Sequence, residues 1–458
     1  MTAPLWTSAE IARATSGTAS NDFAATGVAF DSREVGPGDL FIALTGETTD
    51  GHRFVDAAFA QGAAGAIVGQ PVDHPHVLVP DTTAALEALG RAARARTSAK
   101  IIGVTGSVGK TGTKEALFAC LDRFAPGQAH RSVKSYNNHT GVPLSLARMP
   151  AGTRFGVFEM GMNHAGELAA LTRQVRPHVA IITTIAPAHI ENFADEAGIA
   201  DAKAEIFQGL EQGGVAVIPI LSPHYPRLRA AAERVTDRVV TFGDNADADV
   251  APLEIMPTDA GQFITARVHR RELSFTLAQP GPHWVANAMA VLAAVDAVGG
   301  DLGQAGLALA ELGGLAGRGA RLRVPVDGGE ALVIDESYNA NPASMRATLA
   351  VLAAEPAKRK LAVLGEMKEL GSHAPAFHAA LAEPVLAAGV EAAILVGEPM
   401  AHLAKALEGK AEIVHVADAA AARDRLRAML APGDAVLIKG SNGVGLAAVV
   451  RALANGEA

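Results

Sequence analysis

Short apolar runs alternate with helical stretches along most of the chain. In the middle of the chain, four runs have the length of a buried strand, at 101–104, 155–159, 179–185 and 215–218. Helical segments such as 165–173 and 200–208 lie between them. Because strands that alternate with helices form parallel sheets with helices on both faces, this pattern predicts a doubly wound sheet.

The same alternation divides the chain into three units. Residues 1–97 predict a small α/β unit, with strands at 28–30, 40–43, 66–68 and 77–79 and a helix at 54–61. Residues 98–315 hold the central sheet, and a glycine-rich turn at 313–319 follows it. Residues 316–458 predict a second doubly wound, Rossmann-like sheet, with strands at 331–334, 360–364, 392–396, 413–416 and 435–438. A domain takes roughly 100–200 residues, so we predict an α/β protein of three domains.

Composition and charge exclude several classes of function. The chain is 49% hydrophobic and 19% charged, which is typical of a globular protein, and its net charge of −9 creates no field that favours a polyanion. We therefore expect no nucleic-acid partner. The N-terminus has no secretory pattern, no apolar run approaches the length of a membrane span, and the lone Cys120 fits a reducing compartment. We expect a cytoplasmic, monomeric protein without a membrane span.

A glycine-rich turn directly after the run 101–104 carries the sharpest chemical signal. It reads Thr105-Gly106-Ser107-Val108-Gly109-Lys110-Thr111 and leads into a helical stretch from about Lys110. The backbone N–H groups of such a turn bind phosphates, a lysine here reaches the terminal phosphates, and the threonine hydroxyl binds Mg²⁺. The common phosphate loop has glycine where this chain has Val104. The turn predicts a nucleoside triphosphate site.

This short phosphate loop, together with further blocks in the same order, resembles the Mur ligase family. The other blocks are DSREVGPGDLFIALTGETTDGHRF at 31–54, NNHTGVPLSL at 137–146, EMGMNHAGEL at 159–168, AHIENF followed by DAKAEIF, and DESYNANPASM at 335–345. The resemblance implies an ATP- and Mg²⁺-dependent ligase that forms an amide bond through an acyl phosphate, in peptidoglycan precursor synthesis.

Within the family, three features favour one activity. They are Asn137-Asn138, the run from Tyr338 to Pro342, and LGEMKELG at 364–371; the chain also has no Asp-Asn-Pro-Arg run. These features imply the substrates UDP-N-acetylmuramoyl-tripeptide and D-alanyl-D-alanine. Two alternatives stay open: a ligase that adds the third residue to a UDP-N-acetylmuramoyl-dipeptide, and a non-catalytic nucleotide-binding regulator on the same scaffold.

Candidate metal ligands follow from strand ends and from the resemblance. Thr111 and Glu159 offer hard oxygen atoms, and Glu159 ends a strand expected beside the phosphate-loop strand. The resemblance implies His189 as a ligand of a second Mg²⁺. It also implies that Lys203 carries a carbamate, which would make it an anionic ligand.

The remaining candidates contact nucleotide or substrate. His283 and Asn287 are four positions apart and share a helix face, and the resemblance places Asn287 at the adenine base. It also places Arg318 at the ATP phosphates after domain closure, and either Asp335 or Glu336 near the ribose and metal. For the substrates, the resemblance points to Ser32 and Arg33 at the uridine diphosphate, to Asn137, Asn138 and Thr140 at the muramoyl-peptide, and to Asn339, Asn341 and 439–441 at the dipeptide.

Overall fold

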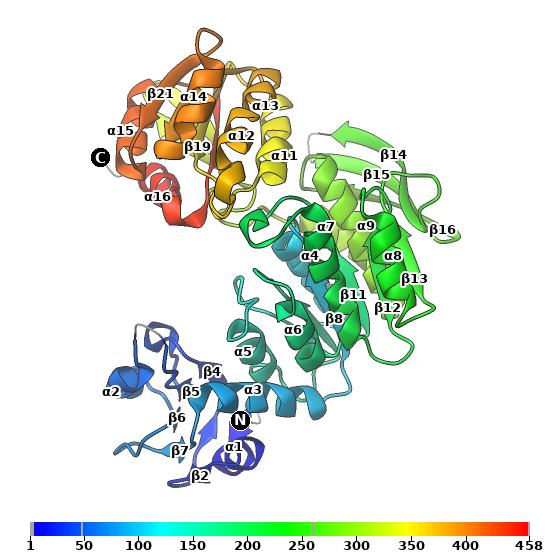
Figure 1. Cartoon of the computed structure of the whole chain (residues 1–458), viewed down its shortest axis with the longest axis vertical. Coiled ribbons are helices and arrows are strands. Elements are labelled where there is room, and N and C mark those ends of the chain that lie inside the picture. The colour runs from blue at the N-terminus through cyan, green and yellow to red at the C-terminus, as the bar shows by residue number, and fades with distance from the viewer. Residues whose placement is uncertain (1–3, 47–48, 259–260, 457–458) are drawn as a thin grey trace.

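The computed structural model describes residues 4–46, 49–258 and 261–456. Within these residues the strands form sheets of five, nine and six strands and one two-stranded ribbon, β1 (Trp6–Thr7) with β3 (Ala24–Ala25). The three larger sheets follow one another along the long axis in chain order (Figure 1). None of the helices in the described ranges is long and apolar enough to cross a membrane.

The first sheet has the order β2-β7-β6-β5-β4. Its strands are β2 (Thr18–Ala19), β4 (Gly27–Ala29), β5 (Asp39–Ile42), β6 (Gly65–Val68) and β7 (His76–Leu78), and its helices are α1 (Ser8–Thr15), α2 (Val55–Ala60) and α3 (Thr82–Ala95). Helix α3 also packs against α5 (Gly141–Ala147) of the central unit. A Cβ atom at Gly90 would lie 3.0 Å from the carbonyl oxygen of Pro143, so glycine lets the two helices approach closely.

The second sheet has the order β16-β15-β14-β13-β12-β11-β8-β10-β9. Its parallel strands are β8 (Lys100–Thr105), β9 (Ala129–Arg131), β10 (Phe155–Glu159), β11 (Val179–Ile182), β12 (Val215–Pro219) and β13 (Val239–Phe242). The chain leaves β8 for β9 and β10 on one side and later returns to β11 on the other. Ligands of open parallel sheets bind where strand order reverses, at the carboxyl ends of the strands. This rule places the site at Thr105, Glu159 and Ile182.

An antiparallel extension of this sheet was not predicted. It consists of β14 (Val250–Thr258), β15 (Gly261–Val268) and β16 (Arg271–Leu277). Strand β14 contains Pro252 and Pro257, and its register shifts between Pro252 and Glu254. Proline disfavours a strand interior and is found at edges and bulges, so the sequence pattern conceals this strand.

The third sheet has the order β17-β18-β22-β19-β20-β21, and only β17 runs antiparallel to its neighbour. Its strands are β17 (Ala320–Val326), β18 (Gly329–Glu336), β19 (Arg359–Gly365), β20 (Val390–Val396), β21 (Glu412–Val416) and β22 (Asp434–Lys439). The carboxyl ends of β18 and β22 meet, since Glu336 pairs with Lys439.

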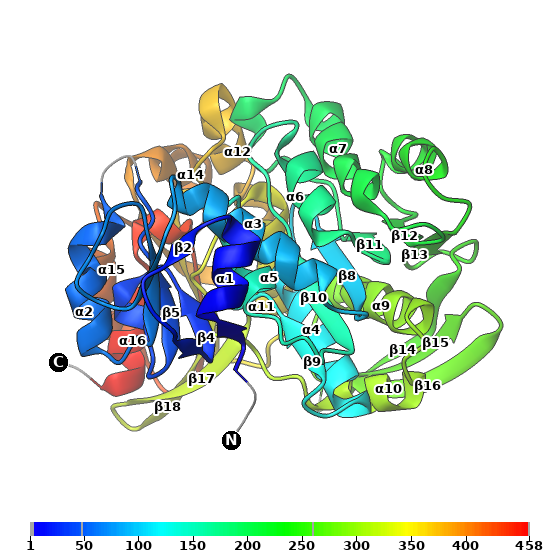
Figure 2. The ribbon, with the colours of Figure 1, turned by 90° about the horizontal axis from the view of Figure 1, so that it is seen from below.

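Helices cover both doubly wound sheets (Figures 1 and 2). Besides α5, the central unit has α4 (Lys110–Phe124), α6 (Glu167–Val175), α7 (Glu196–Ala204), α8 (Tyr225–Glu233), α9 (Pro282–Ala297) and α10 (Leu302–Glu311). The third unit has α11 (Pro342–Ala353), α12 (Ala374–Ala379), α13 (Ala382–Ala387), α14 (Ala401–Leu407), α15 (Ala419–Met429) and α16 (Ala447–Asn455). One cluster of buried apolar residues contains members from both units.

The predicted α/β class with mostly parallel sheets is confirmed. Each predicted strand agrees with an observed one to within two residues, except that the run 179–185 forms a strand only to Ile182. Residues 183–186 instead hold the phosphate loop. The boundaries 1–97, 98–315 and 316–458 stay a prediction.

Candidate active site

The phosphate loop lies between the end of β8 and the start of α4 and is fastened to the segment after β11. Ser107 donates from its backbone to Thr184 and from its hydroxyl to the carbonyl of Ala186, and Thr183 donates to the carbonyl of Val108 at 2.5 Å. Gly106 has φ +149, and a Cβ atom there would lie 1.9 Å from the hydroxyl of Thr183. A side chain at this position would clash with Thr183, so glycine allows the loop to lie against the segment after β11.

The open side of the loop presents donors. The amides of Val108 and Gly109 bond to no other described residue, and the first N–H groups of α4 add to them because a helix start leaves its donors unpaired. Lys110 donates from Nζ to the carbonyl of Gly106 at 2.7 Å. Burial lowers the pKa of Lys110, with Glu159 opposing and Arg318 reinforcing that shift. This concavity has the donor pattern that binds phosphate.

A carboxylate lies beside the start of α4. Thr111 donates from Oγ1 to Glu159 at 2.8 Å, and Asn137 donates from Nδ2 to the other oxygen of Glu159, also at 2.8 Å. Glu159 is only 1% exposed. The predicted neighbouring strands are thus found side by side, and Thr111 and Glu159 are brought together.

Lys203 lies in the last turn of α7, while Glu205 and Phe207, which were predicted on the same helix, lie on the following 3-10 helix, Glu205–Gly209. Lys203 is 2% exposed. Among the described residues no hydrogen bond or ion pair engages its amino group. Burial, with the positive charge of Lys110 added, lowers its pKa well below the usual value. Burial therefore favours the neutral form of this amine over the charged form.

His189 also faces the central cavity. Its Nδ1 atom lies 2.6 Å from Oε2 of Glu369 in the third unit, although the contact is not a hydrogen bond of good geometry. This contact lowers the pKa of Glu369.

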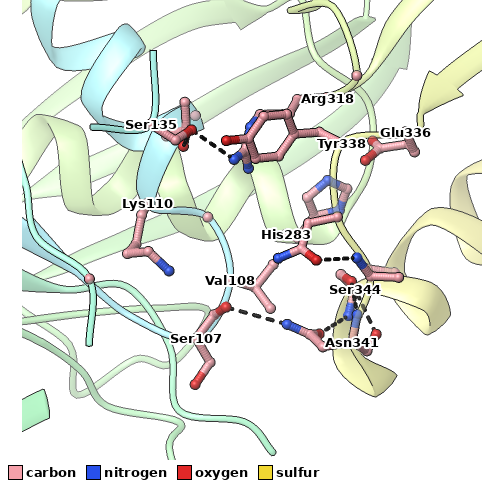
Figure 3. A pocket seen from close by; sticks show the side chains of 18 of the residues that line it. Ser107, Val108, Lys110, Ser135, His283, Arg318, Glu336, Tyr338, Asn341 and Ser344 are labelled. Atoms are coloured by element: carbon pink, nitrogen blue, oxygen red, sulfur yellow. Dashed lines mark hydrogen bonds between the residues drawn. The ribbon is translucent and has the colours of Figure 1, made fainter. Parts of the chain in front are cut away.

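The third unit closes the other side of the phosphate site (Figure 3). Arg318 donates from Nη2 to the hydroxyl of Ser135 at 3.1 Å, and its guanidinium carbon lies 4.1 Å from the ring centre of Tyr338. Ser135 in turn lies 3.4 Å from the hydroxyl of Thr111. Asn341 donates from Nδ2 to the carbonyl of Ser107 at 3.4 Å.

The structure separates the roles of Asp335 and Glu336. The carboxylate of Asp335 accepts from the backbone of Gly317 at 2.7 Å and from the hydroxyl of Ser337 at 2.6 Å, so it holds the turn before β17. Glu336 faces the cavity and lies 3.5 Å from Nζ of Lys439. Burial raises the pKa of Glu336 and lowers that of Lys439. Glu336 is therefore the one of the two whose side chain lines the cavity.

These groups surround a cavity of about 300 Å³. Its far wall is the start of α9, where His283, Trp284 and Asn287 face it. A Cβ atom at Gly109, with φ +88, would lie 2.8 Å from the side-chain oxygen of Asn287, so Asn287 lies directly over the phosphate loop. Burial lowers the pKa of His283 to about 4, with a contribution from Lys439, so its ring is neutral near pH 7.

The predicted substrate contacts are only partly brought together. Asn137 and Asn339 face the cavity. Asn341 also lines the cavity, while it caps α11 and contacts Ser107. Asn138 instead accepts from Thr140 and Gly141 at the start of α5. Their role at a substrate stays a prediction.

Ser32 and Arg33 lie on a 3-10 helix of the first unit, Ser32–Glu34. Arg33 pairs with Asp31 at 2.6 Å. The neighbouring Glu34 accepts from the hydroxyl of Tyr136 at 2.9 Å and also contacts Lys134. These two contacts join the first unit to the loop that carries Ser135. Glu47 and Thr48 of the first sequence block lie outside the described residues.

Sequence reasoning did not assign Ser135, Tyr338, Trp284 or Glu369. Ser135 precedes the block at 137–146 by two positions, and Tyr338 lies inside the block at 335–345, so their place in or near those blocks was the signal available. Glu369 lies inside LGEMKELG at 364–371, a segment in which the sequence alone gives no residue a role.

The donor set fits Mg²⁺. Among the described residues no three His, Cys, Asp or Glu side chains converge as a metal cluster. Mg²⁺ bound by one or two protein oxygen atoms takes its other ligands from phosphates and water. The buried Glu159 and the hydroxyl of Thr111, which face the phosphate loop, match that mode.

Known proteins resemble the chain over almost all of its length. Residues 24–97 match "Mur ligase family, catalytic domain", residues 104–295 match "Mur ligase middle domain", and residues 320–442 match "Mur ligase, glutamate ligase domain". The UDP-N-acetylmuramoyl-tripeptide--D-alanyl-D-alanine ligase of Escherichia coli is 35% identical, with 94% of each chain covered, and that of Bacillus subtilis is 33% identical, with 93% of each covered.

Two solved structures share the architecture. MurF from Acinetobacter baumannii has a TM-score of 0.85 at 30% identity, with 99% of each chain covered. MurF ligase from Thermotoga maritima in complex with ADP has a TM-score of 0.76 at 26% identity, with 94% of this chain and 97% of that chain covered.

Proposed function

The chain belongs to the Mur ligase family, and from this membership we propose that it joins D-alanyl-D-alanine to UDP-N-acetylmuramoyl-tripeptide at the expense of ATP. The observation that carries the proposal is the near-full-length similarity to ligases of that name, which accompanies a cavity shared by the phosphate loop and the third unit. The reaction serves peptidoglycan precursor synthesis.

The chemistry has two steps. A carboxylate oxygen of the tripeptide attacks the γ-phosphorus of ATP. ADP departs as the leaving group, and an acyl phosphate forms. The amine of the dipeptide then attacks the acyl carbon, phosphate departs with the bonding electron pair, and the amine loses a proton. Catalysis of phosphoryl transfer is largely positioning and charge stabilisation, which the residues around the cavity can supply.

The central unit holds ATP. The free amides of the loop and Lys110 bind the phosphates, and Asn287, over Gly109, meets the adenine side. Thr111, Glu159, His189 and a carbamylated Lys203 would hold Mg²⁺, which neutralises charge on the transferring phosphate when bound. The lowered pKa of Lys203 supports the carbamate, because only an unprotonated amine adds to CO₂.

The third unit contributes a positive charge to the reaction. Arg318 stabilises the phosphates, Glu336 lies toward the ribose, and Asn339 and Lys439 lie on the wall proposed for the dipeptide. We assign residues 1–97 to the uridine nucleotide, 98–315 to ATP and 316–458 to the dipeptide. Because the reaction draws on ATP and a uridine nucleotide, we place the enzyme in the cytoplasm. We also propose that it acts as a monomer.

Phosphate release tests the proposal. Purified protein with Mg²⁺ and ATP is given UDP-linked di- or tripeptide acceptors, each with D-alanyl-D-alanine or a panel of single amino acids. We expect phosphate release only when the UDP-linked tripeptide and D-alanyl-D-alanine are both present. Release with a single amino acid and the UDP-dipeptide would assign the chain to third-residue addition, and binding of nucleotide without any release would indicate a regulator.

A further inference from the structure

Two loops from different units meet at the edge of the cavity. One follows β11 and contains His189 and the 3-10 helix Ile190–Asn192, and the other follows β19 and contains Glu369 and the 3-10 helix Gly371–His373. Ile190, Met367 and Leu370 are buried members of one apolar cluster. The meeting of the loops is therefore a packed contact between the central and third units.

Both residues of the closest polar contact adopt an unusual backbone conformation. His189 has φ 58 and Glu369 has φ 63, in the left-handed region. This backbone conformation is unfavourable for residues other than glycine, so it persists only where the surrounding structure fixes it, often at functional sites. Gly371 also has a positive φ, and a Cβ atom there would lie 2.9 Å from Cβ of Glu191.

The third unit holds the Glu369 loop from its own side. The backbone N–H of Met367 donates to Nε2 of His378 at 2.9 Å, and that of Lys368 donates to the hydroxyl of Ser441, also at 2.9 Å. The position of the Glu369 carboxylate is thus set by the third unit.

The contact leaves one ring nitrogen of His189 for a ligand. Nδ1 is buried and lies 2.6 Å from Oε2 of Glu369, while the residue lines the cavity. Histidines that bind metal ions commonly direct their second ring nitrogen to a carboxylate, which fixes the orientation of the ring. Nε2 is then the nitrogen that remains for the metal ion.

We propose that Glu369 is a positioning residue that orients His189 for metal binding from the third unit. The second metal position is then complete only when the third unit lies against the central one, which couples metal binding to the arrangement of the units. This inference rests on the metal role of His189 under the proposed function. In the simpler alternative, His189 and Glu369 form only a contact between units. Half-exposed ion pairs contribute little to stability, so loss of this pair would then leave metal affinity unchanged.

The test measures Mn²⁺ binding to the full-length protein by electron paramagnetic resonance, with a non-hydrolysable ATP analogue and the UDP-tripeptide present. The variants are Glu369→Ala, His189→Ala and the double variant. Glu383→Ala, an exposed glutamate of α13, is the matched control. Affinity for the ATP analogue, measured separately, verifies that each variant is folded.

We expect two Mn²⁺ ions in the wild-type protein. Glu369→Ala should weaken the second by about 10–100-fold, the range found when such supporting carboxylates are removed. The double variant should bind no more weakly than His189→Ala, because Glu369 acts only through that ring, and Glu383→Ala should bind as the wild type does.

Three results would overturn the proposal. They are unchanged Mn²⁺ affinity in Glu369→Ala, losses that add in the double variant, and a wild-type protein that binds a single ion. Unchanged binding in His189→Ala would remove the metal role of His189 itself. Dipeptide-dependent phosphate release by the wild-type protein is scored separately, so a failure here is distinguishable from a failure of the ligase assignment.

Discussion

Nη2 of Arg318 donates to the hydroxyl of Ser135 at 3.1 Å, across 183 positions of sequence. Ser135 lies 3.4 Å from Thr111, whose hydroxyl donates to Glu159 at 2.8 Å. A line of polar contacts thus runs from the third unit to the candidate metal ligands. The arginine expected at the phosphates only after domain closure lies at the phosphate site in this structure.

Replacing Arg318 should affect turnover far more than substrate binding. We expect Arg318→Ala to lower kcat by about 10²–10³-fold, the cost of removing one stabilising donor. Binding of the uridine substrate to the first unit should stay nearly unchanged, because the guanidinium of Arg318 contacts Ser135 and Tyr338, which lie outside that unit. Steady-state kinetics and calorimetric titration of the UDP-tripeptide check both points. Arg323→Ala, an exposed arginine on β17, is the control. A large loss of uridine-substrate affinity in Arg318→Ala would contradict the division of labour among the three units.

We expect Lys203 to be required because its proposed carbamate supplies a negative charge. We expect Lys203→Ala to lose most activity, with no recovery on addition of bicarbonate, because alanine has no amine to carbamylate. A short-chain carboxylic acid should restore part of the activity by occupying the space of the carbamate. Phosphate-release rates with and without acetate or propionate measure the effect. Lys405→Ala, an exposed lysine on α14, should behave as the wild type with either additive. Near-normal turnover of Lys203→Ala would refute the role.

The parts of the site that sequence predicted are those that local pattern determines. The phosphate loop follows directly from a strand–turn–helix pattern, and Glu159 beside it follows from the end of a neighbouring parallel strand. Asp335 and Glu336 could not be separated in this way. Adjacent residues of a strand point to opposite faces, and only the packed sheet shows that Glu336 is on the cavity side.

Long-range contacts lay beyond the sequence pattern. Ser135 and Glu369 lie in loops whose positions depend on how the three units pack, and no local periodicity records that packing. The strand β14 was concealed for a local reason, since its two prolines oppose a strand prediction.

Gly109 should be required for nucleotide binding beyond its effect on stability. A Cβ atom at Gly109 would meet Asn287 at 2.8 Å, and φ is +88. Gly127 also has a positive φ, of +71, with nothing within 4 Å of a Cβ atom. Both Gly109→Ala and Gly127→Ala should therefore lose about 1–2 kcal/mol of unfolding free energy from backbone strain. Only Gly109→Ala should also lose affinity for ADP, measured by calorimetry. Equal ADP affinity in the two variants would show that Asn287 and the loop do not form one nucleotide site.

Protonation of His378 should weaken the third unit at mildly acidic pH. The residue is fully buried. Its Nδ1 lies 2.7 Å from the carbonyl of Ala374, and its Nε2 accepts from the backbone of Met367. Burial lowers its pKa, the Ala374 carbonyl and Glu366 oppose that shift, and His402 adds to it. A proton on Nε2 would remove the acceptor that holds the loop of Met367.

The sign follows from the lowered pKa. The ordinary pKa of histidine is about 6.5. As pH falls below this value, the unfolded chain binds a proton at His378 that the folded protein does not bind. The unfolding free energy therefore falls by up to about 1.4 kcal/mol per pH unit. The loss ends once pH passes below the folded pKa, and above about pH 7.5 this group gives no pH dependence. Denaturant unfolding of the wild type and of His378→Gln should be measured between pH 5 and 8. The unfolding free energy should depend less steeply on pH in the variant. His139→Gln, at an exposed histidine, should retain the wild-type slope. Parallel slopes for the wild type and His378→Gln would mean that His378 binds its proton equally in both states.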